Sequence, residues 1–240
     1  MSTNILAKIV ESKFGEVADR KMQINTKQLE DMPLFAKKCL SLKANLLDRS
    51  KTGIIAEFKR QSPSKGMINA VADVNEVTKA YSDFGAAGVS VLTDGPYFGG
   101  SLADLSIAIQ NPIPVLRKEF IIDEFQLIEA KAFGASVILL IASCLTPAET
   151  KQLAGIAKSL GMEVLLELHD EAELEYICQE VDFVGINNRS LKSFEVNIEH
   201  SLKLKNLLPK EKLSIAESGI YDLATFQLLK KEGFDGFLMG

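Results

Sequence analysis

Residues 54–66 read Ile54-Ile55-Ala56-Glu57-Phe58-Lys59-Arg60-Gln61-Ser62-Pro63-Ser64-Lys65-Gly66. The apolar start of this stretch predicts a buried strand, and the cluster from Ser62 to Gly66 predicts the turn that ends it. Side chains alternate along a strand, so Glu57 and Lys59 share one face. Charges at the end of an apolar strand are costly to bury unless they are paired or used. The stretch therefore indicates either a functional site or a structural ion pair, with equal weight on its own.

The same pattern recurs along the rest of the chain. Short runs rich in Val, Ile and Leu alternate with segments of helical period, which predicts parallel strands buried on both faces and joined by helices. The expected strands are 54–59, 88–92, 114–118, 136–141, 163–168, 183–187, 213–217 and 236–239. The expected helices lie near 73–84, 101–109, 124–133, 147–160, 171–180, 198–208 and 221–231.

Eight strand–helix units predict an α/β fold, a closed (β/α)₈ TIM barrel. A doubly wound sheet is the alternative, but no GxGxxG follows the first strand. We expect residues 51–240 to form the barrel and residues 1–50 to form an N-terminal helical extension, all within a single domain, because so short a stretch cannot bury a core of its own. In the extension, Ile5, Ile9 and Phe14 are expected on one side of a first helix. A second helix is expected to carry Phe35, Cys39, Leu42 and Leu46.

Composition restricts the class of protein. The 240 residues carry 27 Lys and Arg against 32 Asp and Glu, a net charge of −5, which is unlike a nucleic-acid binder. Cys39, Cys144 and Cys178 are widely spaced and form no CxxC, which predicts free thiols in a reducing compartment. His169 and His200 fit no metal-site spacing, so we expect no metal. The N-terminus does not resemble a signal peptide, and no window is apolar enough to span a bilayer, so we expect a cytoplasmic protein.

Polar residues stand at the carboxyl ends of five of the expected strands, where barrels of this type place their active sites. Each has a structural alternative: Glu119 as a rim charge, Asp170 as a helix cap, His169 as a loop residue, and Arg117 as a side chain that faces the surrounding helices. Five independent accidents are less plausible than one site. The lysines suggest an anionic substrate, and Ser218-Gly219 before a helical segment can present N–H groups to a phosphate. The residues are Glu57 and Lys59; Arg117, Lys118 and Glu119; Glu167; Asn187, Asn188 and Arg189; and Glu217, Ser218 and Gly219.

At this point the sequence resembles the indole-3-glycerol-phosphate synthase family over nearly its whole length. Six motifs occur in the family's order. They are Ile55–Arg60 with Ser62-Pro63-Ser64, Ser90–Asp94 with Phe98–Ser101, Pro114–Ile121, Leu165-Leu166-Glu167, Gly185–Leu191 and Ala216–Ile220. Each motif is weak alone, but six in register are specific.

The resemblance implies a carboxy-lyase of tryptophan biosynthesis without a cofactor. It would convert 1-(2-carboxyphenylamino)-1-deoxy-D-ribulose 5-phosphate to indole-3-glycerol phosphate, carbon dioxide and water. By resemblance, Lys118 is the general acid, Lys59 binds the substrate carboxylate and can share acid work, Glu167 is the leading candidate for the base, and Glu57 holds Lys59 and Lys118 or assists. Asn187 and Glu217 orient hydroxyls and the aniline nitrogen. The remaining residues implied for substrate binding are Phe98 and Phe120 on the aromatic ring, Arg189, and Ser62, Ser218, Gly219 and Gly240 around the phosphate.

The sequence departs from the family's pattern at Gly240, where family members continue with a phosphate-binding segment and a last helix. We expect a truncated chain, in which an exposed barrel flank could allow weak association of an otherwise monomeric protein. A second interpretation is another barrel enzyme of the same pathway, such as phosphoribosylanthranilate isomerase. The presence of Glu57, Lys59 and Lys118 argues against it. A third is a barrel that binds a phosphorylated ligand without turnover, or an inactive partner subunit.

Overall fold

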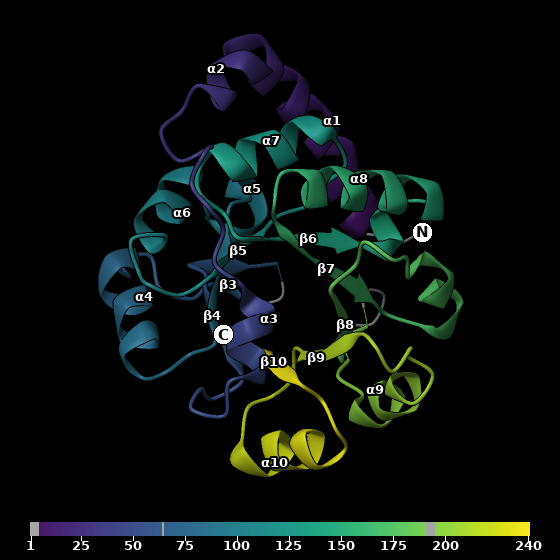
Figure 1. The fold of residues 1–240 in the computed structure, drawn as a ribbon. Coiled ribbons are helices and arrows are strands. Elements are labelled where there is room, and N and C mark those ends of the chain that lie inside the picture. Colours follow the sequence, from purple (N-terminus) through teal and green to yellow (C-terminus); the bar gives the residue numbers. More distant parts are fainter. Residues whose placement is uncertain (1–4, 64, 191–194) are drawn as a thin grey trace.

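A closed barrel of parallel strands forms the centre of the computed structural model, which describes residues 5–63, 65–190 and 195–240 (Figure 1). Around the barrel, the strand order is β1-β10-β9-β8-β7-β6-β5-β4. The strands are β1 (Ile54–Phe58), β4 (Gly88–Leu92), β5 (Val115–Lys118), β6 (Val137–Ile141), β7 (Glu163–Leu168), β8 (Phe183–Asn187), β9 (Leu213–Glu217) and β10 (Gly236–Met239). The predicted (β/α)₈ architecture is confirmed. Ser64 and Leu191, which belong to the quoted motifs, lie outside the described residues.

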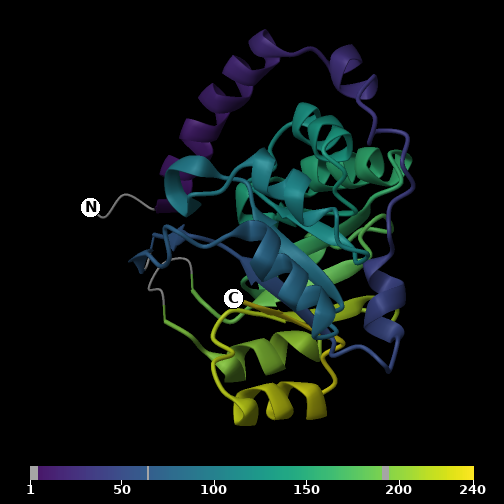
Figure 2. The ribbon, with the colours of Figure 1, turned by 90° about the vertical axis from the view of Figure 1, so that its left-hand side faces the viewer.

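Helices surround the barrel and connect successive strands (Figures 1 and 2). They are α4 (Val74–Asp83), α5 (Gly95–Phe98), α6 (Leu102–Ala108), α7 (Glu124–Ala132), α8 (Pro147–Ser159), α9 (Ile198–Lys205) and α10 (Leu223–Lys231), with the 3₁₀ segments η1 (Ala142–Cys144) and η2 (Glu171–Tyr176). Side-chain caps set where many of them begin. At α8, Thr146 and Glu149 form a reciprocal capping box around Pro147, a residue suited to the first helical turn.

Two layers of apolar side chains account for the barrel's stability. One fills the barrel interior and includes Ile55, Leu116, Leu139, Leu165 and Phe183. The other lies between the strands and the surrounding helices. Because successive strand side chains point to opposite faces, both layers require apolar residues, which explains the near-continuous Val, Ile and Leu runs.

The N-terminal segment runs from one end of the barrel to the other (Figure 2). It contains α1 (Ile5–Gln23), α2 (Thr26–Glu30) and α3 (Leu42–Leu47). Helix α3 closes the end at which the strands begin: Leu42 is 1% exposed, and the Asn45 amide donates to Ala87 O at 2.8 Å. At the opposite end, Leu6 and Ile9 of α1 line the main cavity of the molecule.

Several local expectations were wrong. Phe14 is 63% exposed, because the position one turn after Ile9 belongs to Lys13, which is buried. Phe35 lies in a turn and Cys39 in a segment without regular secondary structure before α3, so they are not part of a helix. The expected helix near 171–180 is the shorter 3₁₀ segment η2. An additional two-stranded hairpin of β2 (Gln61–Ser62) and β3 (Gly66–Met67) follows β1.

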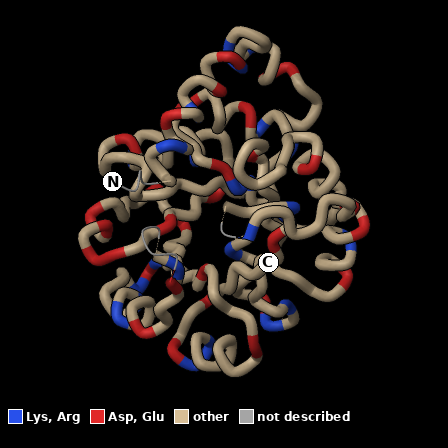
Figure 3. The backbone as a smooth tube through the Cα atoms, turned by 180° about the vertical axis from the view of Figure 1, so that it is seen from behind, with Lys and Arg blue, Asp and Glu red and all other residues tan. Residues whose placement is uncertain are grey.

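The charged residues of both signs are interspersed around the barrel in Figure 3. Among the described residues, no helix is both long and apolar enough to cross a membrane. Cys39, Cys144 and Cys178 are all free thiols.

Candidate active site

The side chains singled out in the sequence converge at the carboxyl end of the barrel. They surround one cavity of about 480 Å³. Lining it are Glu57, Lys59, Ser62, Phe98, Lys118, Phe120, Glu167, Asn187, Arg189, Ser218, Gly219 and Gly240. Glu217, which completes the predicted set, is fully buried and reaches the site through its contact with Lys118.

Lys118 lies at the centre of the site. It extends from β5 towards β9, the strand opposite in the barrel order, and its Nζ lies 2.8 Å from Glu217 Oε2. The same Nζ lies 3.4 Å from Glu167 Oε2 on β7. An ammonium between two buried carboxylates is held in place while keeping a donor for a ligand in the cavity.

The charges around Lys118 determine its protonation. Burial alone would lower the Lys118 pKa, but Glu217, Glu167 and Glu57 outweigh burial and raise it. The raised pKa means that Lys118 carries its proton at neutral pH.

Glu167 and Glu217 share Lys118 but differ in protonation. Burial would raise the pKa of Glu167, yet Lys118 and His169 hold it well below its usual range, so Glu167 is ionised. Burial and the neighbouring Glu167 charge raise the pKa of Glu217 to about 7 against the pull of Lys118. Two carboxyls whose environments push their pKa values apart are typical of acid–base sites.

Glu57 and Lys59 do share one face, as the strand period predicts. Lys59 Nζ donates to Glu57 Oε1 at 2.6 Å, and the Glu57 charge acts on Lys118 from further away. Gly240 lies against this pair, where an added Cβ would stand 2.6 Å from Lys59 Nζ. The close approach explains why a glycine suits this position.

His169 is a functional candidate that the sequence reasoning set aside as a loop residue. Its Nε2 lies 3.2 Å from Glu167 Oε1, and its backbone N–H donates to Glu173 Oε2 at 2.5 Å. Burial would lower the His169 pKa, but the contact with Glu167 raises it. The two-residue spacing from Glu167 was visible in the sequence, but it does not show that the loop folds His169 back against Glu167 and Glu173.

The turn after β9 has the backbone that a phosphate site needs. Ser218 and Gly219 both have positive φ, 65° and 72°, and the Asn188 amide donates to Ser218 O at 2.7 Å. A non-glycine residue at positive φ is strained and is typical of functional turns. The following helix contributes less than expected, because it begins only at Leu223 and Asp222 caps its N-terminus.

Further basic groups stand near this turn. The Arg189 guanidinium donates to the Tyr221 hydroxyl at 2.7 Å, and Lys65 Nζ lies 5.4 Å from the centre of the Tyr221 ring. All three residues line the cavity. Lys65 was not among the predicted site residues, although it belongs to the first quoted stretch.

The opposite side of the cavity is apolar. The rings of Phe98 and Phe120 lie 6.0 Å apart, between centroids, after β4 and β5. Helix α1 adds Ile5, Leu6 and Ile9 to the same lining. The cavity thus has an aromatic end, a charged centre and a polar end, which matches a substrate with an aromatic ring and a phosphate.

Glu119 lines the cavity between Lys118 and Phe120, whereas Arg117 does not. Glu119 is 5% exposed, so its alternative as a rim charge is wrong. Arg117 faces the helices as expected: it donates to Gln126 O at 2.8 Å and to Glu129 Oε2 at 2.8 Å. The Asp170 side chain accepts from the Ala172 N–H and caps η2, which confirms its interpretation as a helix cap.

Comparisons with known proteins point in one direction. A family profile described as indole-3-glycerol phosphate synthase matches residues 6–240. The indole-3-glycerol phosphate synthase of Bacteroides thetaiotaomicron is 43% identical over 240 residues, covering 99% of this chain and 91% of the relative. That of Acinetobacter baylyi is 40% identical over 243 residues, covering 100% and 90%.

More distant solved structures share the barrel alone. An N-acetylmannosamine-6-phosphate 2-epimerase from Clostridium perfringens has a TM-score of 0.60 at 14% identity, over 80% of this chain and 87% of that one. The YdjI aldolase from Escherichia coli has a TM-score of 0.59 at 16% identity, over 84% and 81%. At such identities the likeness concerns the fold and not the chemistry.

Proposed function

The chain belongs to the indole-3-glycerol phosphate synthase family, and on that premise we propose how its side chains divide the reaction. The activity is the conversion of 1-(2-carboxyphenylamino)-1-deoxy-D-ribulose 5-phosphate to indole-3-glycerol phosphate. The ring carbon that bears the carboxylate attacks the ketose carbonyl, whose oxygen takes a proton. Carbon dioxide then leaves and restores the aromatic ring, and loss of water completes the indole.

Lys118 is the general acid for ring closure. The supporting observation is its position: Nζ lies in the middle of the cavity, anchored by Glu217 and Glu167. Its raised pKa keeps it charged, so it stabilises negative charge as that charge develops on the carbonyl oxygen. Glu217 is buried behind Lys118 and positions it, and its predicted part in orienting the substrate's hydroxyls and aniline nitrogen stays a prediction.

Glu167 is the base that takes a proton during dehydration. Its lowered pKa leaves it ionised and able to accept, and the Asn187 amide orients it by donating to Oε1 at 3.0 Å. Asn187 also lines the cavity and can orient a substrate hydroxyl. Lys59, held by Glu57, binds the substrate carboxylate and supplies the second acid when water leaves.

The two ends of the cavity bind the two ends of the substrate. Phe98 and Phe120 contact the carboxyphenyl ring, for which their spacing and the apolar face of α1 are suited. The phosphate lies at the polar end, on the positive-φ turn and the nearby basic groups. The groups proposed there are Ser62, Arg189, Ser218, Gly219 and Gly240.

Replacement of Lys118 by alanine tests the central assignment. We expect Lys118→Ala to lower kcat by about 10²–10⁴-fold, the usual contribution of a positioned acid, in a fluorescence assay of indole-3-glycerol phosphate formation. Lys158→Ala is the matched control, because Lys158 also pairs with a carboxylate, Asp182 at 2.7 Å, but lies on the outside of α8. Turnover of Lys118→Ala within tenfold of the parent would contradict the assignment.

We also propose that the enzyme acts as a monomer in the cytoplasm and that residues 1–50 fold with the barrel of residues 51–240 as one domain. Free thiols at all three cysteines and the packing of α3 against the barrel support this. Sedimentation equilibrium should return the chain mass of 26.3 kDa. A dimer mass at micromolar concentration would contradict the monomer proposal.

A further inference from the structure

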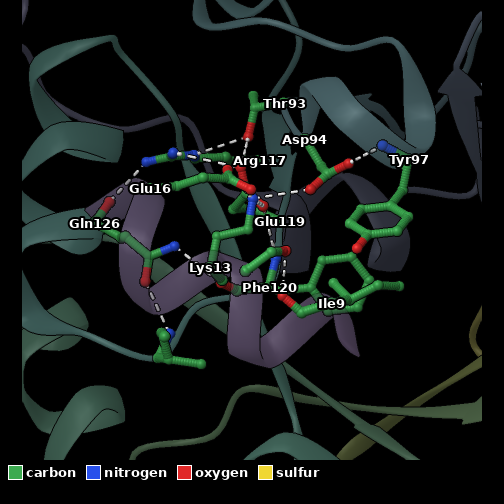
Figure 4. A network of polar contacts seen from close by, with 12 residues as sticks. Ile9, Lys13, Glu16, Thr93, Asp94, Tyr97, Arg117, Glu119, Phe120 and Gln126 are labelled. Atoms are coloured by element: carbon green, nitrogen blue, oxygen red, sulfur yellow. Dashed lines mark hydrogen bonds and ion pairs between the residues drawn. The ribbon is translucent and has the colours of Figure 1, made fainter. Parts of the chain in front are cut away.

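Lys13 of α1 is a buried charge that the reaction chemistry does not use (Figure 4). Its Nζ lies 2.8 Å from Asp94 Oδ2, 3.1 Å from Glu119 Oε1 and 2.7 Å from Glu16 Oε2, and the side chain is 3% exposed. Burying an ammonium is costly unless such partners compensate it. Lys13 therefore depends on its carboxylate partners, and the contacts of those partners show which segments it holds in place.

Asp94 is bonded to the segment that carries Phe98. Its second carboxylate oxygen, Oδ1, accepts from the Tyr97 N–H at 2.8 Å and so caps α5, which ends at Phe98. Lys13 is thus linked through the Asp94 side chain to the backbone of α5, which positions Phe98 at the aromatic end of the cavity.

Glu119 is bonded to the other wall. Its Oε1 accepts from the Phe120 N–H at 2.9 Å, and its Oε2 accepts from the Thr93 hydroxyl at 2.8 Å (Figure 4). Phe98 and Phe120 are therefore each connected by one carboxylate to the same ammonium. Glu119 is also the chain neighbour of Lys118.

Lys13 shares a face of α1 with the side chains that cover the cavity. Ile9 lies four residues before it and Leu6 seven residues before it, and both are buried against the cavity. Residues at these spacings lie above one another on a helix. The ion pairs consequently fix the rotation of the apolar face of α1 over the site.

No other cation can replace Lys13 within the described part of the chain. Asp94 forms its ion pair with Lys13, and Arg117, 3.7 Å from Glu119, is already paired with Glu129 at 2.8 Å. Burial would lower the Lys13 pKa, but Glu119, Asp94 and Glu16 raise it, so the charge persists at neutral pH.

We infer that Lys13 is a positioning residue: through Asp94 and Glu119 it holds α1, Phe98 and Phe120 in the arrangement that binds the carboxyphenyl end of the substrate. The inference rests on the proposed placement of that ring. It assigns to the N-terminal helix an effect on substrate binding, distinct from proton transfer at Lys118.

Steady-state kinetics of Lys13→Met separate the two effects. We expect KM for the carboxyphenylamino-deoxyribulose phosphate to rise at least tenfold while kcat changes less than threefold, because the reacting groups remain in place. Lys21→Met is the matched control on the same helix: Lys21 pairs with Asp123 at 2.7 Å, but this pair is exposed. Its KM should stay within twofold of the parent value. Lys118→Ala in the same assay tests the proposed function separately, through kcat.

The double variant Lys13→Met/Asp94→Asn distinguishes positioning from simple charge compensation. It removes the Lys13 charge together with that of one of its three carboxylate partners, and asparagine remains a good helix cap, so the variant should be more stable than Lys13→Met. We expect its thermal midpoint to return towards the parent while KM stays raised at least tenfold. A KM restored to within twofold of the parent, or a Lys13→Met enzyme with unchanged KM, would overturn the inference.

Discussion

The two ends of the barrel use the same residue types for opposite purposes. At the end where strands begin, carboxylates bond to the backbone: Glu163 accepts from Leu42 N at 2.7 Å, Asp182 from Val164 N at 2.8 Å, and Asp235 from Ser214 N at 2.7 Å. At the end where strands finish, Glu57, Glu167 and Glu217 surround the ammonium groups of Lys59 and Lys118. Backbone donors cannot titrate at neutral pH, so the first arrangement is fixed, whereas the second can exchange protons.

The contrast shows that a carboxylate in this barrel is structural or chemical according to which end of a strand it occupies. Glu163 and Glu167 make the point within one strand, since they stand at the first and fifth positions of β7. The former joins the N-terminal segment to the barrel, and the latter faces the cavity. Replacing each by glutamine is therefore the sharpest test of the comparison.

At the cavity end, we expect Glu167→Gln to lower kcat by about 10²–10⁴-fold, because the amide cannot accept the proton. The thermal midpoint should stay close to that of the parent, since Lys118 keeps its shorter contact with Glu217. Steady-state kinetics and a thermal unfolding curve on the same preparation measure both quantities.

At the other end, Glu163→Gln should have the reverse effect. The Glu163 carboxylate accepts from the Ser41 hydroxyl, Leu42 N and Lys43 N at the start of α3, and loss of its charge should cost about 1–2 kcal/mol of unfolding free energy. We expect kcat to be unchanged. If this variant lost turnover as severely as Glu167→Gln, the division between the two ends would not hold.

The sequence predicted the chemical end better than the structural one. Lys118, Glu167 and Glu217 follow apolar runs, so the strand period and the barrel rule together place them at one edge. By contrast, no local sequence pattern predicts that Glu163 caps α3, because the residues of α3 that it contacts lie 120 or more positions earlier. Lys13 was missed for the same reason, because its partner Asp94 is 81 positions away. Phe14 was misassigned to the buried face because an amphipathic pattern was assumed to bury only apolar residues.

His169 shows a different limit. Its type and position were visible in the sequence, but its role depends on burial and on Glu173, which η2 brings back towards it. A histidine two residues after a strand-end glutamate is therefore informative only once the loop conformation is known.

The protonation of Glu217 offers another test of the difference between the two barrel ends, because it makes the stability of the protein depend on pH. Folding raises the Glu217 pKa from 4.5 to about 7, chiefly because the carboxyl is buried. Between these values the folded state keeps a proton that the unfolded chain has lost. The Glu217 contribution to stability is thus fully present below about pH 4.5 and is lost as the pH rises through 7.

Glu217→Gln cannot titrate at this position, so its unfolding free energy relative to the parent should increase by about 1–3 kcal/mol between about pH 5 and pH 8. Urea unfolding at both pH values measures the difference, and Glu232→Gln, at the exposed end of α10, should follow the parent throughout. A flat or falling difference for Glu217→Gln would mean that Glu217 is ionised across this range. Of the two carboxyls that contact Lys118, only Glu167 would then remain as a candidate for proton transfer, beside the acids Lys118 and Lys59.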